Sequence, residues 1–522
     1  MEGTFWAFAP AIIAIILALI SKQVYISLFV GILTGALLYT GGNPLQALGV
    51  LYTVMSEKVG ANVPIIVFLV VLGIFVVLMQ KSGGSRAYGE WAGKKISSKS
   101  GALAATGALG CLIFVDDYFN CLTVGSVMRP ITDKFRVSHA KLAWLIDSTA
   151  APVCIIAPIS SWAAAVSGQL EGNGLTVFIQ TIPFNVYAIL TIIMVFSFCF
   201  LRIDYGKMKK NETIAETTGD LNAGETELPT DEDSSIVANP KGKVRHLIIP
   251  VIILIACCVG GMIYSGFFYN WDSGTYGTEL QSASVIEAFA NCDAGTSLAI
   301  GSTIALILVA AYYMMARIVS FKEITNSFTQ GFKTMVPAIL ILTFAWTIAG
   351  IMGAKGGYLD AQSFVETNMA LIPATVQSLF PAIFFILACG IAFATGTSWG
   401  TFGVLVPIAV TILGGSGTLV LMTVSATLGG AVFGDHVSPI SDTTILASTG
   451  GNCNHVDHVK TQFPYAALIA VITFISYVVA GLLSTLGSVV SCVIMWGVAL
   501  VLFLIAVLVI KAVSKKNAIV SK

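Results

Sequence analysis

The 522-residue chain is 56% hydrophobic and only 10% charged, whereas a soluble protein carries roughly 25% charged residues. No soluble core could bury so much apolar surface, so most of the chain must be solvated by lipid. The 27 basic and 27 acidic residues cancel, which gives no sign of a nucleic-acid partner. The ten cysteines lack the paired spacing of a zinc site and are interpreted as small apolar fillers.

A helix needs about 20 apolar residues to cross a bilayer. The first apolar run has no basic leader or cleavage site, so we expect a retained span and not a signal peptide. In chain order the predicted spans are 4–21, 24–41, 61–80, 140–166, 183–201, 246–266, 293–316, 337–354, 418–447, 464–484 and 487–511.

Two further apolar stretches, 101–128 and 380–408, are rich in Gly, Thr, Ser and Asn near their centres. This composition favours re-entrant hairpins, which are tolerated only where they are buried in protein or line a water-filled cavity. The alternative is that each stretch is one ordinary span.

Residues 202–245 are polar, acidic at the centre and basic at both ends. We expect a solvated, disordered cytoplasmic linker here. It separates a first transmembrane repeat, 1–201, from a second, 246–486. An extra C-terminal span and tail, 487–522, have no partner in the first half.

Four anchors recur in order in both halves, at nearly constant spacing. They pair Pro64 and Gly83 with Pro337 and Gly356, Pro130 with Pro407, Pro158 with Pro439, and Pro183 with Pro464. Loops 81–99 and 129–141 are basic, but their counterparts 354–370 and 407–418 carry one basic residue between them. Basic loops are cytoplasmic, so the repeats are predicted to be inverted. The fold class is therefore an all-α polytopic membrane protein, with the N-terminus outside and the C-terminus inside.

Inverted repeats place substrate and ion sites near the midplane, where helices break. One break is predicted at 434–444, where Pro439 disfavours helix at Ser438. Freed carbonyls, hydroxyls and the carboxylates of Asp435 and Asp442 are hard oxygen donors that suit a small hard cation. A carboxylate in a membrane marks function by default. The alternative is a capping turn at a membrane face, with Asp442 at the start of the following helix.

The first half has a matching break at 157–162, but its carboxylates come from the 101–128 hairpin. If hairpin and broken helix meet within each half, two Na⁺ sites result. The first would use Asp116, Asp117, Asn120, Ser160 and Ser161; the second would use Thr395, Thr397, Ser398, Asp435, Ser438, Ser441, Asp442 and Thr443. Paired carboxylates raise the pKa of one member, which would let such a site exchange a proton for Na⁺.

Other polar residues carry weaker signals. His436 could sense pH or simply hydrogen-bond to backbone at the break. His455 and His458, expected in a cytoplasmic loop, are a weak metal pattern. Asp147 is expected to pair with Arg129 or Lys141, or to mark the wet end of its helix. The sequence has no phosphate-binding glycine loop and no hydrolase nucleophile elbow, so an enzyme or an ATP-driven pump is disfavoured.

The segment GDHVSPISDTTILAS (434–448) resembles the signature of the NhaC family of sodium/proton antiporters. The resemblance extends from about residue 5 to 485 and includes the Asp116-Asp117 pair and the PISSW segment at 158–162. It implies a cofactor-free antiporter of the bacterial inner membrane that takes up protons and expels Na⁺, and by superfamily analogy a homodimer. The family also implies an alternative, a sodium-coupled carrier or exchanger of an amino acid or small organic acid.

Overall fold

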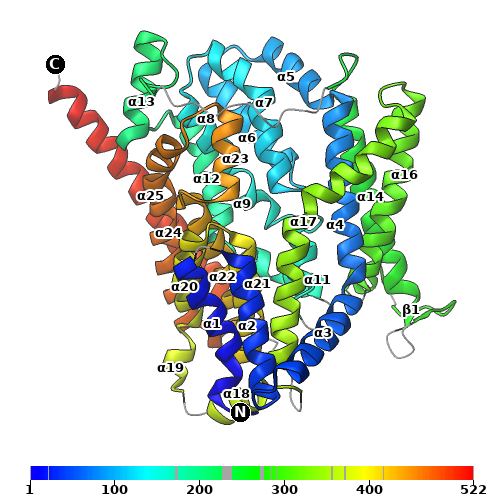
Figure 1. The fold of residues 1–522 in the computed structure, drawn as a ribbon. Helices are drawn as coiled ribbons and strands as arrows, with labels where there is room; N and C mark the ends of the chain where they lie inside the picture. Colours follow the sequence, from blue (N-terminus) through cyan, green and yellow to red (C-terminus); the bar gives the residue numbers. More distant parts are fainter. Residues whose placement is uncertain are drawn as a thin grey trace.

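The computed structural model describes residues 2–21, 23–170, 174–225, 238–270, 275–282, 284–290, 292–353, 357–369, 372–414 and 417–520. Helices dominate the described chain (Figure 1). The one described sheet is a two-stranded antiparallel ribbon of β1 (Tyr269–Asn270) and β2 (Thr275–Tyr276).

The helices of the first half run up to the linker. They are η1 (Phe5–Phe8), α1 (Ala9–Ser21), α2 (Val24–Tyr39), α3 (Pro44–Ala61), α4 (Val63–Ser82), α5 (Gly84–Lys95), α6 (Lys99–Leu112), α7 (Asp117–Lys134), α8 (His139–Ser148), α9 (Ala151–Cys154), α10 (Ser161–Ser167), α11 (Gly174–Thr181), η2 (Ile182–Phe184), α12 (Val186–Leu201) and α13 (Gly206–Thr218).

The helices of the second half follow the linker. They are α14 (Arg245–Phe268), α15 (Val285–Ala290), α16 (Ala294–Met315), α17 (Phe321–Met352), α18 (Ala361–Met369), α19 (Ala374–Gln377), α20 (Phe380–Thr395), α21 (Ser398–Leu413), α22 (Thr418–Val437), α23 (Asp442–Gly451), α24 (His455–Leu482), η3 (Ser484–Leu486) and α25 (Ser488–Val520).

Eight helices in the described residues are long and apolar enough to cross a membrane: α4, α12, α14, α16, α17, α22, α24 and α25. The expected span 24–41 is the first arm of a pair, α2 and α3, that bends by 117°. The expected span 140–166 is divided into α8, α9 and α10, and the gap between α9 and α10 overlaps the break predicted at 157–162. The expected span 418–447 is divided into α22 and α23, and this gap lies within the break predicted at 434–444. The chain is thus a polytopic membrane protein.

Two helices begin earlier than their apolar runs do, because capping residues start them. Ser320 and Glu323 form a capping box at the start of α17, so this helix begins 16 residues before the predicted residue 337. The Asn454 side chain accepts from the Asp457 backbone N–H and starts α24. The prediction that His455 and His458 lie in a loop is therefore wrong, because both lie on the first turn of a membrane helix.

The linker is also more ordered than its composition indicates. Residues 206–218 form α13, whose Met208 and Glu212 are buried. Glu212 pairs with Lys99 at 2.6 Å and accepts from the Ser138 backbone N–H at 2.7 Å. The expectation of a disordered linker is therefore wrong for this part. Residues 226–237, the most acidic part of the linker, lie outside the described residues.

The two helix–break–helix pairs lie at opposite ends of the bundle. In Figure 1, α6 and α7 occupy the upper part together with α5 and α13, whereas α20, α21 and the N-terminus lie in the lower part. The C-terminal end of α25 lies near the upper end.

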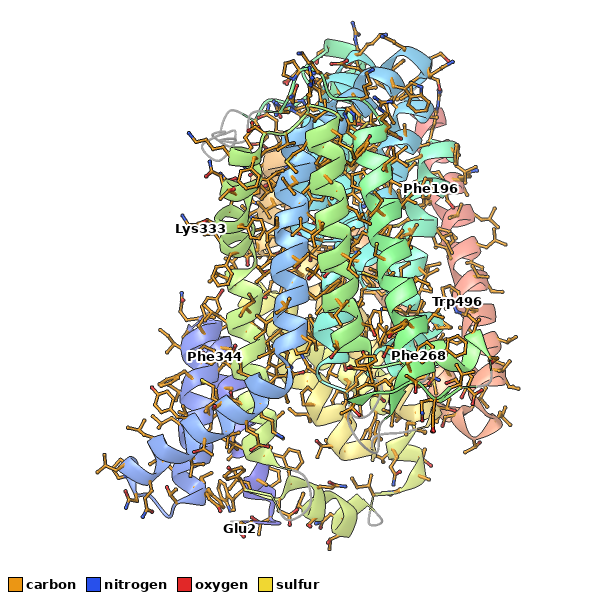
Figure 2. The ribbon with its side chains drawn as sticks, turned by 90° about the vertical axis from the view of Figure 1, so that its right-hand side faces the viewer. Glu2, Phe196, Phe268, Lys333, Phe344 and Trp496 are labelled. Carbon is orange, nitrogen blue, oxygen red and sulfur yellow. The ribbon has the colours of Figure 1, made fainter. Side chains whose placement is uncertain are left out.

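Small residues allow the closest helix contacts. A methyl group on Gly73 of α4 would lie 2.3 Å from the Gly331 carbonyl oxygen of α17, and one on Gly125 of α7 would lie 2.4 Å from the Gly450 backbone of α23. Lipid gives helices no hydrophobic reason to associate, so such close backbone packing is a main source of membrane-helix cohesion. Figure 2 shows α4, α14 and α16 side by side, α25 along one edge, and Lys333 projecting outward from α17.

Candidate functional site

Four helices begin inside the protein at breaks in the chain. Each break ends in a capping side chain that accepts a hydrogen bond from the backbone N–H three residues later, which satisfies one of the free donors at a helix start. The four pairs are Asp116 with Phe119 in α7, Ser160 with Ala163 in α10, Thr397 with Gly400 in α21, and Ser441 with Thr444 in α23.

The first-half break and the 101–128 segment meet directly. The Ser161 backbone N–H donates to the Val115 carbonyl at 2.9 Å, and the Trp162 indole N–H donates to Asp117 Oδ2 at 2.9 Å. Asp116 and Asp117 are 1% and 0% exposed. Two carboxylates are therefore held side by side at the start of α7, where the partial positive charge of the helix end favours anions.

Two of the residues predicted for this first site bond to the backbone. The Asn120 amide donates to the carbonyls of Gly110, Ile113 and Thr149 at 2.7–2.9 Å, which ties together the ends of α6, α7 and α8. The Ser160 hydroxyl donates toward the Cys154 and Ala157 carbonyls. Both side chains thereby fix the geometry of the breaks around the Asp116-Asp117 pair.

The second break brings three of the predicted side chains together. Thr443 Oγ1 donates to Asp435 Oδ2 at 2.6 Å, and Ser441 Oγ lies 3.3 Å from Thr443 Oγ1. Asp435 is 1% exposed. The hydrogen bond therefore spans the break, from the end of α22 to the first turn of α23, with the carboxylate enclosed.

Asp442 has a different environment from Asp435. Its side chain is exposed, and the neighbouring Pro439 and Ile440 are exposed as well. The Tyr118 hydroxyl of α7 lies 3.5 Å from Asp442 Oδ2. One carboxylate of the second break is enclosed and the other is accessible.

The threonine hydroxyls of the 380–408 segment form hydrogen bonds within their own helices. Thr395 donates to the Ile391 carbonyl, and Thr397 accepts from the Gly400 N–H; the Ser398 side chain is buried. This segment touches the second break through backbone: the Ser438 hydroxyl donates to the Phe393 carbonyl at 2.8 Å. A methyl group on Gly396, which has a φ of +70°, would lie 2.4 Å from the Ile440 carbonyl oxygen. Only glycine combines this conformation with so close an approach.

The two predicted sites adjoin each other across the halves. Helix α7 packs on α23 at Gly125 and Gly450, and the Trp162 ring of α10 lies 5.6 Å from that of Trp399 in α21. The four internal helix starts therefore converge on one central region of the protein.

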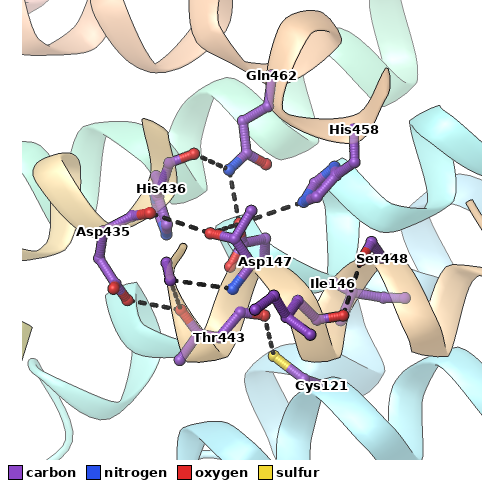
Figure 3. Close-up of polar contacts among 12 residues, drawn as sticks. Cys121, Ile146, Asp147, Asp435, His436, Thr443, Ser448, His458 and Gln462 are labelled. Atoms are coloured by element: carbon purple, nitrogen blue, oxygen red, sulfur yellow. Dashed lines mark hydrogen bonds and ion pairs between the residues drawn. The ribbon is translucent and has the colours of Figure 1, made fainter. Parts of the chain in front are cut away.

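Sequence reasoning missed a buried cluster centred on Asp147 (Figure 3). Its carboxylate is 0% exposed, and Oδ2 contacts His458 Nε2 at 3.4 Å, Gln462 Nε2 at 2.6 Å and Thr444 Oγ1 at 3.3 Å. The expected pairing with Lys141 is wrong, because Lys141 pairs with Asp204 on the linker side. The available signal was an acid in an apolar run, together with His458 and Gln462 one turn apart on what proved to be a helix.

His436 lies beside this cluster. Its Nδ1 is 2.9 Å from the Tyr187 hydroxyl of α12, and its backbone carbonyl accepts from Gln462 at 2.7 Å. The side chain is 1% exposed. His455 is only half-buried, and its Nε2 lies 2.8 Å from the Pro439 carbonyl oxygen in the break. Among the described residues, no three His, Cys, Asp or Glu side chains form a cluster that could hold a metal ion.

Comparisons with known proteins agree with this architecture. Residues 171–482 match the model of the Na⁺/H⁺ antiporter family. An uncharacterized protein of Haemophilus influenzae is 39% identical over 499 residues, which cover 92% of this chain and 91% of that protein. The malate-2H⁺/Na⁺-lactate antiporter of Bacillus subtilis is 33% identical over 31% of this chain and 33% of its own length. The arginine/ornithine antiporter ArcD of Halobacterium salinarum is 39% identical over 22% of this chain and 24% of its own length.

The matched region contains the second break and the helices that surround it, and the matched family consists of transporters, not enzymes. The resemblance to NhaC antiporters seen in the sequence is thereby confirmed. The chain belongs to the Na⁺/H⁺ antiporter family.

Proposed function

We propose that this protein exchanges Na⁺ for H⁺ across a bacterial inner membrane by alternating access. The observation that carries the proposal is the pair of acidic breaks at the centre of the bundle. Asp116 and Asp117 lie at one internal helix start, and Asp435 is held across the other break by Thr443. Carboxylates, hydroxyls and carbonyls freed at breaks are hard oxygen ligands, which suit Na⁺ better than softer metals.

Na⁺ would bind at the two breaks, next to the carboxylates that lie there. In the first site Asp116 and Asp117 supply the charge, and Asn120, Ser160 and Ser161 hold the surrounding backbone. In the second, Asp435 and Thr443 form the enclosed part and Asp442 the accessible part, with Ser438, Ser441 and Ser398 around them. Two acids side by side disfavour double ionisation unless a cation lies close to both, so each acidic break attracts Na⁺.

Inverted symmetry would supply alternating access. Support comes from the equivalent order of elements in each half: a long helix, a helix–break–helix pair and a broken helix whose cap follows the Pro-Ile dipeptide, at Ser160 and at Ser441. The two helix–break–helix pairs lie at opposite ends of the bundle in Figure 1. On this basis repeats 1–201 and 246–486 are related by inversion and rock against each other around the central region.

The proposed orientation places the upper end of Figure 1 in the cytoplasm. The basic residues of α5, α13 and the end of α7 lie there, together with the C-terminal end of α25. Basic residues near membrane helices mark the cytoplasmic side. The N-terminus, at the lower end, would then face outside, and the 202–245 linker would be cytoplasmic.

Exchange can be tested in proteoliposomes that contain a pH-sensitive dye and an imposed proton gradient. Addition of Na⁺ should dissipate the gradient, K⁺ should not, and Asp435→Asn should remove the Na⁺ response. A matched control is Glu57→Gln, because Glu57 is an exposed carboxylate on α3. A gradient that responds equally to Na⁺ and K⁺, or that responds to Na⁺ unchanged in the Asp435 variant, would contradict the proposal.

A second candidate is sodium-coupled exchange of a small carboxylate or amino acid. It is favoured by two partial relatives, a malate-2H⁺/Na⁺-lactate antiporter and an arginine/ornithine antiporter. The convergence of four helix starts also favours it, because these ends attract a substrate carboxylate. This candidate is tested by the uptake of radiolabelled malate, lactate, arginine or ornithine into liposomes under a Na⁺ gradient. Na⁺-driven uptake of one of these compounds, without proton movement on addition of Na⁺, would favour it over Na⁺/H⁺ exchange.

A further inference from the structure

We propose that Asp147 and His458 form the proton-binding pair of the exchanger, a site distinct from the acidic breaks that hold Na⁺. The inference rests on the proposed Na⁺/H⁺ exchange and adds to it the place where the proton binds. Asp147 lies on α8 of the first half and His458 on α24 of the second, and both side chains are 0% exposed. Figure 3 shows the two side chains facing each other.

The pair is neutral only when it holds one proton. With a proton, it is either an imidazolium facing a carboxylate or a neutral acid facing a neutral imidazole. Without the proton, it leaves one net negative charge in a membrane-embedded interior, which is costly unless it is compensated. Within the described residues no lysine or arginine contacts Asp147, since Lys141 on the same helix pairs with Asp204. The deprotonated pair therefore favours the arrival of a cation nearby.

The titratable groups that interact electrostatically with Asp147 come from four helices. They are His455 and His458 of α24, Asp435 and His436 of α22, Tyr187 of α12, and Cys121 of α7. Two of these groups, Asp435 and His436, lie at the second break itself. The charge of the Asp147–His458 pair therefore changes the electrostatic potential where Na⁺ is proposed to bind, because the protein interior screens charges weakly.

Two side chains join the pair to that break physically. Thr444 Oγ1 lies 3.3 Å from Asp147 Oδ2 and 3.0 Å from the Asp435 carbonyl oxygen. One hydroxyl has a single proton, so it cannot donate to both acceptors at once. When Asp147 is ionised, its carboxylate competes for that proton; when Asp147 itself carries the proton of the pair, the hydroxyl is free to hold the end of α22.

Gln462 makes the second connection. Its amide nitrogen donates both to Asp147 Oδ2 at 2.6 Å and to the His436 carbonyl at 2.7 Å. The second oxygen of Asp147, Oδ1, has no hydrogen-bond partner among the described residues, and neither does His458 Nδ1. Each member of the pair therefore keeps an unused atom through which a proton can enter or leave, while Oδ2 stays tied to the break. Half-buried His455, one turn before His458, lies toward the surface.

The test separates proton binding from Na⁺ binding. Reconstituted wild-type protein and Asp147→Asn are compared in two assays: Na⁺-driven proton movement with a pH dye, and exchange of ²²Na⁺ for unlabelled Na⁺ at equal pH on both sides. The Asp147 variant should lose the first activity, keep the second, and exchange Na⁺ at a rate that no longer depends on pH. Asp435→Asn should lose both activities.

A merely structural role for Asp147 is distinguished by the ²²Na⁺ exchange, which a misfolded protein would lose. If Asp147→Asn does not fold, His458→Gln is measured in its place and should behave in the same way. If the wild type moves protons with Na⁺, and the Asp147 or His458 variant also moves them with an unchanged pH profile, the assignment of the proton to this pair is wrong but the proposed function stands. A wild type in which Na⁺ moves no protons overturns the proposed function and the assignment with it.

Discussion

The Trp162 indole donates a 2.9 Å hydrogen bond to Asp117, joining the start of α10 to the start of α7. Both groups are buried. A carboxylate in this position is retained only if donors stabilise it, and the indole is the one side-chain donor to Asp117 found among the described residues. The position of Asp117 thus depends on the broken helix beside it.

Replacement of Trp162 by Phe should therefore destabilise the protein and weaken Na⁺ binding. Loss of the donor leaves a buried carboxylate oxygen without its partner, at a cost of about 1–2 kcal/mol in a membrane interior. Thermal unfolding in detergent, with and without Na⁺, measures both effects. Trp399→Phe is the matched control: Trp399 is also buried, but its indole N–H has no partner among the described residues. Equal losses in the two variants would contradict the role given to the hydrogen bond.

Removal of the Thr443 hydroxyl should raise the Na⁺ concentration needed for half-maximal transport. Thr443→Val keeps the shape of the side chain but removes the 2.6 Å donor to Asp435 across the break. A hydrogen bond to a charged group contributes about 1.5–3 kcal/mol, so the carboxylate should lose its fixed position. Thr427→Val is the control, since that hydroxyl donates only to the preceding turn of its own helix. The prediction fails if the two variants have the same Na⁺ dependence.

Gly125→Ala should destabilise the contact between α7 and α23. The added methyl group would lie 2.4 Å from the Gly450 backbone, so the helices must separate. Overpacking of this kind costs about 1–3 kcal/mol, and here it would also shift Asp117 relative to Asp442. Gly390→Ala provides a comparison, because a methyl group there meets nothing within 4 Å. Monodispersity and melting temperature in detergent report the difference.

Neutralisation of Glu212 should loosen the attachment of the linker to the bundle. Glu212→Gln removes the charge that pairs with Lys99 and weakens the hydrogen bond accepted from the Ser138 N–H, a loss of about 1–3 kcal/mol. Limited proteolysis between α12 and α14 should become faster. Glu216→Gln should have a smaller effect, because the Glu216 side chain is 58% exposed. If the Glu216 variant is cleaved as fast as the Glu212 variant, the buried pair is not what holds α13.

Much of the fold could be predicted because lipid imposes a strict length and composition on each span. The polar breaks at Pro158 and Pro439 were also visible, because proline and polar residues interrupt apolar runs. The starts of α17 and α24 were missed, since capping by Ser320 and Asn454 extends helix into polar sequence. Helix α13 was missed because its order comes from contacts with Lys99 and Ser138, which are distant in the sequence.

The candidate site could be predicted only as far as residue type. Asp116, Asp117 and Asp435 stood out as acids in apolar surroundings, and the structure encloses all three. The sequence could not show that Asn120 bonds to three carbonyls, or that Asp147 meets His458 from the other half. Those contacts join residues that are between 7 and 311 positions apart, and periodicity carries no information about which helices become neighbours.

The central claim is that the protein exchanges Na⁺ for H⁺ and that Na⁺ binds at the acidic breaks. Its most direct test is Na⁺-driven proton movement in proteoliposomes, measured for the wild type and for Asp442→Asn. Asp442 is the accessible carboxylate beside the enclosed Asp435, so its neutralisation should remove the Na⁺ response while the protein stays folded and monodisperse. A folded Asp442→Asn variant that exchanges Na⁺ for H⁺ at the wild-type rate would contradict the account.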